Sequence, residues 1–260
     1  MKRFNVFTSD RMRISAQLYT VRQIGDLKAQ LELVAGTGFA DIETIGFHDL
    51  SPPQMVDQVR QSGLNVRSAH FEWWEFESRF QDILFLLRKL ECHVAVMPWL
   101  TPEARPDTVG GWRAVSGQLN IWADQLAVHG VKLAYHNHDF DLEDYQGVTP
   151  LDLILAQGNI WWQPDIGWLV AAGLDPAAAI KRYGDRIISV HAKDFDPLAG
   201  QGDECWRDLG QGVVDWPAVL AALGNTGCTD LFVEHDETLD HQRTMETGRR
   251  FLTDQLCEGV

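Results

Sequence analysis

The stretch LAYHNHDF, residues 133–140, joins an apolar run to a group of polar side chains. Val131 to Tyr135 have the composition of a buried strand, and the chain then continues directly into His136, Asn137 and His138. A buried strand that ends in histidines either carries incidental polar residues or delivers side chains to a site. The pattern of the remaining sequence bears on which interpretation holds.

Short apolar runs of this kind recur along the chain and alternate with longer segments of helical periodicity. The expected strands are residues 14–19, 40–44, 66–70, 93–97, 132–136, 160–164, 187–191 and 231–234. The expected helices include residues 24–38, 76–91, 109–130 and 175–184. Eight such units in 260 residues predict a single-domain (β/α)₈ TIM barrel over residues 1–260. The alternative, an open doubly wound sheet, usually has a glycine-rich turn after its first strand, which this chain lacks.

The composition limits the classes of function. The chain is 45% apolar and carries a formal net charge of −15, without the basic runs that binding to nucleic acid or an anionic membrane requires. No apolar stretch is long enough for a transmembrane helix, and we expect no secretory signal in the basic start, residues 1–13. The four cysteines have no paired spacing, so we expect a cytoplasmic protein without disulfides.

The C-terminal ends of the strands carry the chemistry in a barrel of this kind. Almost every predicted strand ends in a residue that can ligate a metal, titrate or donate a hydrogen bond. In chain order these are Gln17 and Tyr19, Glu43, His70 and Glu72, Pro98 and Trp99, His136 and His138, Asp165, His191 and Lys193, and Glu234 and Asp236. One such residue has an ordinary structural explanation, but a whole rim of them would be costly to desolvate without partners.

Four of these residues suit a metal ion, because they end four successive strands and can converge on one point. They are His136, Asp165, His191 and Glu234. Imidazole and carboxylate suit one divalent cation (Mn, Co, Zn, Fe or Mg), and the lack of cysteine ligands favours a catalytic site. Taken singly, Asp165 could instead cap a helix and Glu234 could pair with a lysine.

Seven motifs extend over nearly the whole chain. They are ISAQLYTVR (14–22), GFADIE (38–43), VKLAYHNHDF (131–140), QPDIGW (163–168), SVHAKDFD (189–196), LGQGVVDW (209–216) and LFVEHDE (231–237). Together they resemble the sugar phosphate isomerase/epimerase superfamily, the xylose isomerase-like TIM barrels, which include inosose dehydratase, ketose 3-epimerases and endonuclease IV. The resemblance implies the same barrel and the same four metal ligands.

The chain departs from this superfamily at two positions. His136 stands where the related epimerases have a carboxylate, which ketose 3-epimerases use with the last-strand carboxylate as opposed acid/base groups. Trp168 stands where the strand-6 motif often has histidine. The first difference disfavours a two-carboxylate epimerase. The second, together with the acidic charge, disfavours chemistry on DNA like that of endonuclease IV.

The residues and the resemblance together predict a metal-dependent sugar isomerase or epimerase that acts on a keto sugar or related polyol through a metal-bound enediolate. Glu234 is the expected base, with Glu43 as the second candidate. His70 and His138 are candidates for returning the proton. Lys193 is expected to stabilise the oxyanion.

Substrate contacts are expected from Gln17, Trp99, Trp168 and Arg207. The Gly210–Gly212 loop beside Arg207 offers weak evidence for a phosphate site. Two alternatives stay open: a metal-dependent lyase, dehydratase or hydratase of an oxidised (3-keto or inosose-like) sugar, and a non-catalytic sugar-binding barrel. The expected partner is a small-molecule sugar, and a homodimer stays open.

Overall fold

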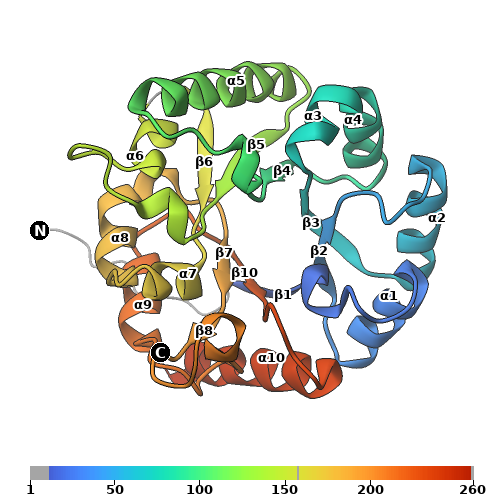
Figure 1. Ribbon diagram of the computed structural model, residues 1–260. Coiled ribbons are helices and arrows are strands. Elements are labelled where there is room, and N and C mark those ends of the chain that lie inside the picture. The colour runs from blue at the N-terminus through green and yellow to red at the C-terminus, as the bar shows by residue number, and fades with distance from the viewer. Residues whose placement is uncertain (1–11, 157, 259–260) are drawn as a thin grey trace, which may run out of the picture.

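Eight parallel strands form a barrel whose outside is covered by helices (Figure 1). The computed structural model describes residues 12–156 and 158–258, so most of the basic start, where we expected no secretory signal, lies outside the described residues. The strands are β1 (Arg13–Gln17), β2 (Asp41–Ile45), β3 (Asn65–His70), β4 (Val94–Met97), β5 (Lys132–His136), β6 (Ile160–Gln163), β7 (Val190–Ala192) and β10 (Asp230–Val233). Each lies within a few residues of its predicted range, which confirms the (β/α)₈ barrel.

The barrel closes between β6 and β7. Hydrogen-bonded neighbours run in the order β6-β5-β4-β3-β2-β1-β10-β7. The isolated bridges Trp162–Ile187 and Asp165–His191 join the two ends of this series. Because contact with β6 is limited to such bridges, β7 begins at Val190 and not at the predicted residue 187. The second bridge sets Asp165 and His191 side by side at the C-terminal end of the barrel.

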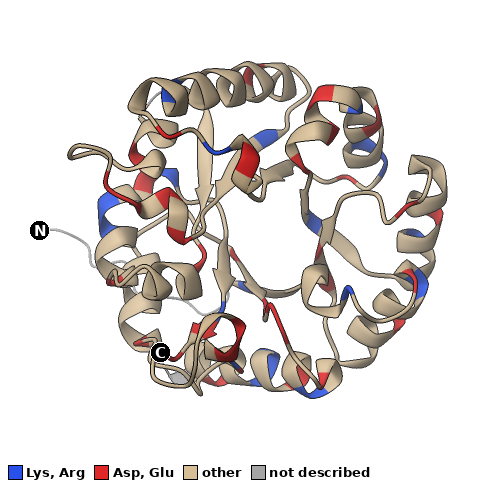
Figure 2. Ribbon diagram, viewed as in Figure 1, with Lys and Arg blue, Asp and Glu red and all other residues tan. Residues whose placement is uncertain are grey.

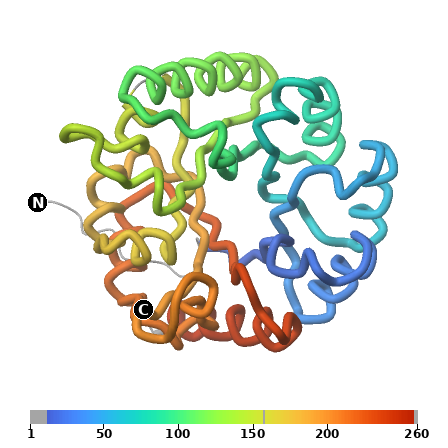
Figure 3. The backbone as a smooth tube through the Cα atoms, viewed as in Figure 1, coloured from blue at the N-terminus to red at the C-terminus, as the bar shows by residue number. Residues whose placement is uncertain are grey.

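The helices follow the strands around the barrel. They are α1 (Leu27–Gly36), α2 (Pro52–Ser62), α3 (Trp73–Ser78), α4 (Phe80–Lys89), α5 (Val109–Ala127), α6 (Pro150–Leu155), α7 (Ile166–Ala171), α8 (Pro176–Tyr183), α9 (Trp216–Leu223) and α10 (His241–Glu258). The chain winds around the barrel from α1 to α10, and α10 returns to pack on β1 and α1 (Figure 3). None of the helices in the described ranges has the length and apolarity to span a membrane.

The predicted helix over residues 76–91 is divided into α3 and α4 at Arg79. Its backbone there leaves the helical region, with φ −128° and ψ 24°. The guanidinium group lies 3.7 Å from the centre of the Phe47 ring and pairs with Asp82, so its contacts favour this break over a continuous helix.

Short elements connect the strands and helices, and all but the 3₁₀ helix before β7 lie on the rim above the C-terminal ends of the strands. The 3₁₀ helices are η2 (Leu18–Val21), η3 (Pro102–Ala104), η4 (Asp139–Leu142), η5 (Gly184–Arg186) and η6 (Gly202–Cys205). A separate antiparallel pair, β8 (Asp194–Phe195) and β9 (Trp206–Arg207), carries η6 between its strands. The rim after β7 is therefore made by a long excursion and not by a short turn.

The interior of the barrel is polar, whereas most barrels of this kind fill it with branched apolar side chains. Buried polar side chains from five strands, and from Ser189 directly before β7, are joined by hydrogen bonds across the interior. They are Gln17, Glu43, Ser68, His70, Gln163, Ser189 and His191. Apolar residues such as Leu133 and Ile160 are buried in a continuous core cluster with those of the helices. The candidate site therefore rests on a polar interior.

Candidate active site

Glu43 is the centre of the polar interior. Its side chain is fully buried and accepts hydrogen bonds from Gln17 Nε2 at 2.6 Å, from Gln163 Nε2 at 2.7 Å and from the Ser68 hydroxyl. Burial alone would raise the pKa of Glu43, but the histidines that contact it lower the pKa well below its ordinary value. Since its oxygens are occupied and it does not border the cavity described below, Glu43 is placed as a fixed acceptor. Its expected role as a second base stays a prediction.

His191 lies between two carboxylates. Its Nε2 is 2.5 Å from Glu43 Oε1, and its Nδ1 is 2.7 Å from Glu234 Oε2. Burial would lower the pKa of His191, but the two carboxylates raise it to about 10. The ring of His70 stacks on it with an interplanar angle of 4°. A histidine whose far nitrogen is held by a carboxylate is the usual arrangement of a metal ligand.

Four side chains converge beside His191. One ligand atom from each lies within 4.8 Å of the others, in what we call the four-residue cluster: His136, Asp165, His191 and Glu234. These are the four residues expected at successive strand ends, and the structure brings them together. A second group, made of His70, His136 and His191, meets the same distance limit.

His136 contributes an imidazole without a hydrogen bond at one nitrogen. Among the described residues, its buried Nδ1 has no partner, and its Nε2 is 3.7 Å from Asp165 Oδ2. Burial, together with the neighbouring His191 and His138, lowers the pKa of His136 well below its ordinary value. The ring is therefore neutral, which is the form that binds a metal.

Asp165 has both of the roles that the sequence suggested as alternatives. Its Oδ1 accepts the N–H of Trp168 at 2.9 Å and so caps α7, which leaves Oδ2 for the cluster. The cluster thus offers two imidazoles and two carboxylates, a donor set that suits a divalent cation. The unpartnered nitrogen of His136 adds to this fit.

Lys193 is surrounded by carboxylates. Its Nζ lies 2.6 Å from Asp236 Oδ1, 3.0 Å from Asp165 Oδ2 and 3.0 Å from Glu234 Oε2, and the side chain is 1% exposed. Burial would lower the pKa of Lys193, but these three neighbours raise it well above its ordinary value. An ammonium group has three donors. One of them binds Asp236, and the ion pairs with Asp165 and Glu234 hold the charge inside the protein, so the oxyanion role expected of Lys193 stays a prediction.

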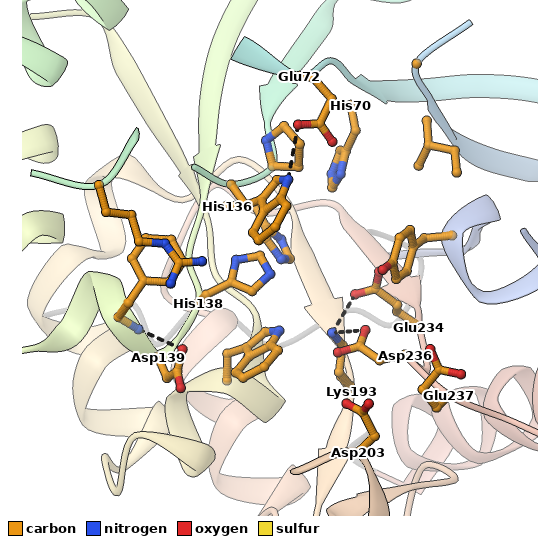
Figure 4. Close-up of a pocket in the computed structure, with 18 residues that line it drawn as sticks. His70, Glu72, His136, His138, Asp139, Lys193, Asp203, Glu234, Asp236 and Glu237 are labelled. Carbon is orange, nitrogen blue, oxygen red and sulfur yellow. Dashed lines mark hydrogen bonds and ion pairs between the residues drawn. The ribbon is translucent and has the colours of Figure 1, made fainter. Parts of the chain in front are cut away.

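A cavity of about 360 Å³ opens above the cluster. Figure 4 shows His70, His136, His138, Lys193 and Glu234 along its walls. The other residues expected at strand ends or as substrate contacts that line it are Tyr19, Glu72, Pro98, Trp99, Trp168 and Asp236. Its size is that of a small-molecule site.

Two expected substrate contacts do not border this cavity. Gln17 is fully buried, with its amide engaged by Glu43 and by the N–H of Tyr19. Arg207 turns its Nη1 to the carbonyl oxygens of Glu204 and Trp206, each at 2.7 Å. A position at a strand end or in a rim loop does not fix the direction of a long side chain, and the two substrate contacts stay predictions.

Besides Glu237, three charged residues of the cavity were not expected from the sequence. Arg105 follows η3, Asp139 begins η4 and Asp203 lies in η6. The Arg105 guanidinium lies 3.6 Å from the centre of the Phe140 ring. All three come from irregular rim segments, where neither strand nor helix periodicity gives a signal. A search of every loop that follows a strand would have included them.

Comparison with known proteins gives the chain a family. A family model described as xylose isomerase-like TIM barrel matches residues 35–255. The chain belongs to this family, which confirms the resemblance carried by its motifs.

Curated relatives match part of the chain. It is 30% identical over 129 residues to the rhizopine catabolism protein MocC of Rhizobium meliloti, covering 45% of this chain and 40% of MocC. It is 29% identical over 87 residues to an inosose dehydratase of Clostridium botulinum, covering 33% of this chain and 29% of the dehydratase. It is 40% identical over 74 residues to SgbU of Escherichia coli, named provisionally as an L-ribulose-5-phosphate 3-epimerase, covering 28% of this chain and 26% of SgbU. The chain thus spans less than half the length of each.

Solved structures match nearly the whole chain. A sugar phosphate isomerase/epimerase from Parabacteroides distasonis superposes with a TM-score of 0.77 at 18% identity, covering 96% of both chains. The IolI protein, solved with a bound zinc atom, superposes with a TM-score of 0.77 at 18% identity, covering 96% of this chain and 99% of that one. At such identities the likeness shows the fold.

Proposed function

We propose that this member of the xylose isomerase-like TIM barrel family is a divalent-metal-dependent isomerase or epimerase of a keto sugar or related polyol. The observation that carries the proposal is the convergence of the four-residue cluster within 4.8 Å beside a cavity that His136 and Glu234 line. The zinc atom of IolI, a protein of the same fold, supports a bound metal in a barrel of this kind.

The cluster would hold the cation through the imidazole nitrogens of His136 and His191 and the carboxylate oxygens of Asp165 and Glu234. A bound divalent cation would polarise the carbonyl group of a ketose and acidify the adjacent C–H bond. Glu43 has the position of an orienting partner, because it holds Nε2 of His191 and leaves Nδ1 directed at Glu234.

Glu234 is the proposed base. It borders the cavity, and although burial would raise its pKa, Lys193 and His191 lower it well below the ordinary value. An ionised carboxylate in this position can accept the proton from the carbon beside the carbonyl. His70 and His138 border the same cavity and are the proposed groups that return a proton.

Aromatic side chains would position the substrate. Trp99 and Trp168 form two walls of the cavity, and Trp99 is fixed by a hydrogen bond from its Nε1 to Glu72 Oε2 at 3.1 Å. Flat apolar faces next to carboxylates suit a polyol, since its C–H surface can pack on the rings while its hydroxyl groups donate hydrogen bonds.

A dehydratase reaction on an inosose-like ketone is the second candidate. The observation in its favour is His136, because a neutral ring at the end of β5 stands where related epimerases have the carboxylate that opposes the last-strand one. Elimination needs one base and one acid. Glu234 takes the proton from carbon, the carbon–oxygen bond to the β-hydroxyl breaks, and His70 protonates the departing oxygen to give water. The similarity to inosose dehydratase points the same way.

Metal content and proton exchange test the proposal. We expect about one divalent cation per chain in the wild type and in His129→Ala, which changes an exposed histidine outside the cluster. His191→Ala and Asp165→Ala should lose the metal while their circular dichroism spectra stay native. Full metal occupancy in both variants would contradict the assignment of the cluster.

The reaction is read from deuterium exchange beside the carbonyl of ketoses, followed by the mass of the product. Exchange without a change in formula indicates isomerisation or epimerisation, and loss of water indicates the dehydratase. Binding of a ketose with no exchange in the fully metallated protein would show a sugar-binding barrel and would overturn the enzymatic proposal.

A further inference from the structure

The cavity has an excess of negative charge. Among the described residues, its lining includes six carboxylates: Glu72, Asp139, Asp203, Glu234, Asp236 and Glu237. The same lining contains two basic side chains, Lys193 and Arg105. Acidic residues lie along the chain in η6 and in the segment after β10 (Figure 2). An anionic ligand would therefore approach through a region of unfavourable potential.

Lys193 does not offset this charge for a ligand. Its ammonium group contacts Asp165, Glu234 and Asp236, all within 3.0 Å, so its positive charge is already balanced inside the protein. Figure 4 shows Asp203 and Glu237 on the same side of the cavity as this group. A phosphate that approached Lys193 would meet more carboxylates than ammonium groups.

The loop that the sequence suggested for phosphate is occupied by Asp194. The buried Asp194 carboxylate accepts the N–H groups of Gly210 at 2.9 Å and Val214 at 3.3 Å and the indole N–H of Trp216 at 3.1 Å. A Cβ atom at Gly212 would lie 2.1 Å from Asp194 Oδ1, so glycine there is explained by close approach of the chain to this carboxylate. The backbone donors of the loop therefore serve an internal anion.

Arg105 is the remaining basic side chain of the lining. Its Nε donates to the carbonyl of Leu100 at 2.9 Å, and its guanidinium packs on Phe140. Selective phosphate sites usually bring several donors together, such as backbone N–H groups at a helix N-terminus or paired arginines. One guanidinium held against an aromatic ring does not make such a site.

From this charge distribution we infer that the cavity selects an uncharged polyol ketone, and that Asp203 and the neighbouring rim carboxylates exclude phosphorylated and carboxylated sugars. The inference rests on the proposed function and narrows its substrate class. Hydroxyl groups of a neutral polyol can donate to the carboxylates, whereas a phosphate monoester adds about two negative charges at neutral pH beside them.

Matched pairs of ketoses test the inference. Deuterium exchange beside the carbonyl is measured for fructose against fructose 6-phosphate and for ribulose against ribulose 5-phosphate, with scyllo-inosose as a cyclic neutral ketone. The metallated protein should give a kcat/KM at least about tenfold higher for neutral ketones than for phosphate esters. Preference for the esters would overturn the substrate class and leave the proposed function intact. Absence of exchange with every ketone would remove both.

A charge reversal at Asp203 distinguishes repulsion of phosphate esters by the rim carboxylates from a simple lack of groups that bind phosphate. Asp203→Lys should raise kcat/KM for the phosphate ester relative to its neutral ketose by about two- to fivefold, the effect of a screened surface charge. Asp57→Lys makes the same change at an exposed position of α2 that does not line the cavity. It should leave the ratio unchanged. An equal shift in both variants, or none in Asp203→Lys, would contradict a role for this rim residue.

Discussion

Replacing Lys193 by methionine removes a buried positive charge from among three carboxylates and keeps a side chain of similar length. The Nζ atom lies 2.6–3.0 Å from oxygens of Asp165, Glu234 and Asp236. Two of these residues belong to the four-residue cluster. The variant therefore tests whether the ammonium group balances the carboxylates that we propose as metal ligands.

The size of the effect follows from the geometry. At 3.0 Å and an effective dielectric constant of about 20, each ammonium–carboxylate pair attracts by about 5 kcal/mol before desolvation is considered. Removing one partner of a buried ion pair lowers the free energy of unfolding by about 3–5 kcal/mol. With about 2–4 °C per kcal/mol in a chain of this size, Lys193→Met should melt about 6–20 °C below the wild type in EDTA.

Lys28→Met is the matched control. Lys28 pairs with Glu32 at 3.7 Å, but their side chains are 71% and 66% exposed, so the pair contributes at most about 1 kcal/mol. The loss in Lys193→Met should be larger at pH 8 than at pH 5. Lys193 lowers the pKa of Glu234, and without it the carboxyls of the folded protein can take up protons at the lower pH.

A divalent cation should partly replace the missing charge. In thermal melts with Mn²⁺ or Zn²⁺, the rise in melting temperature over EDTA should be greater for Lys193→Met than for the wild type. A variant that melts within about 2 °C of the wild type in EDTA at pH 8, a difference of about 1 kcal/mol or less, would refute the charge argument. An equal metal-dependent rise in both proteins would refute the link to the cluster.

Three further substitutions test other parts of the structure. Glu43→Gln should lower the free energy of unfolding by about 3–5 kcal/mol in urea titrations, because a fully buried anion loses its charge among fixed donors; a loss below about 1 kcal/mol would contradict this. Gly212→Ala should destabilise by about 1–3 kcal/mol because its Cβ would meet Asp194, whereas Gly117→Ala in α5, with open space around it, should be neutral or stabilising. Burial raises the pKa of Asp141 to about 7, so the stability that its protonated carboxyl gives the folded protein is fully present below pH 4 and is lost as the pH rises through 7. The free energy of unfolding of Asp141→Asn should therefore rise relative to the wild type by about 1.4 kcal/mol per pH unit across that window. A pH-independent difference would count against this.

The barrel was predictable because each strand is a local pattern. A short apolar run such as residues 132–136 needs no knowledge of its neighbours to be identified, and eight of them with helices between leave few arrangements. The exceptions have local physical causes. β7 is short because its contact with β6 is limited to isolated bridges. The helix break between α3 and α4 accompanies the contacts of Arg79 with Phe47 and Asp82.

The convergence of the cluster was predictable for a related reason. Neighbouring parallel strands end at the same edge of the barrel. Metal-ligating residues at these strand ends, such as His136 and Asp165, are therefore brought close together. The direction and bonding of long side chains could not be predicted. Gln17 and Lys193 turn to partners that become near only after folding, and Arg207 turns to carbonyl groups of its own loop. Residues from the irregular rim, such as Asp203, follow no periodicity at all.

Charge balance connects the metal proposal with the proposed substrate class. Four carboxylates contact the charged groups at the base of the cavity: Glu43, Asp165, Glu234 and Asp236. Two basic groups of the described residues face these carboxylates and have a raised pKa: His191 and Lys193. Carboxylates in excess of basic groups are costly to bury, and a divalent cation offsets them without a further lysine or arginine. The rim carboxylates outside this group, such as Asp139 and Asp203, oppose a ligand that brings its own negative charge. Variants of the carboxylates at the base should therefore change metal affinity, whereas variants of those at the rim should change discrimination against phosphate.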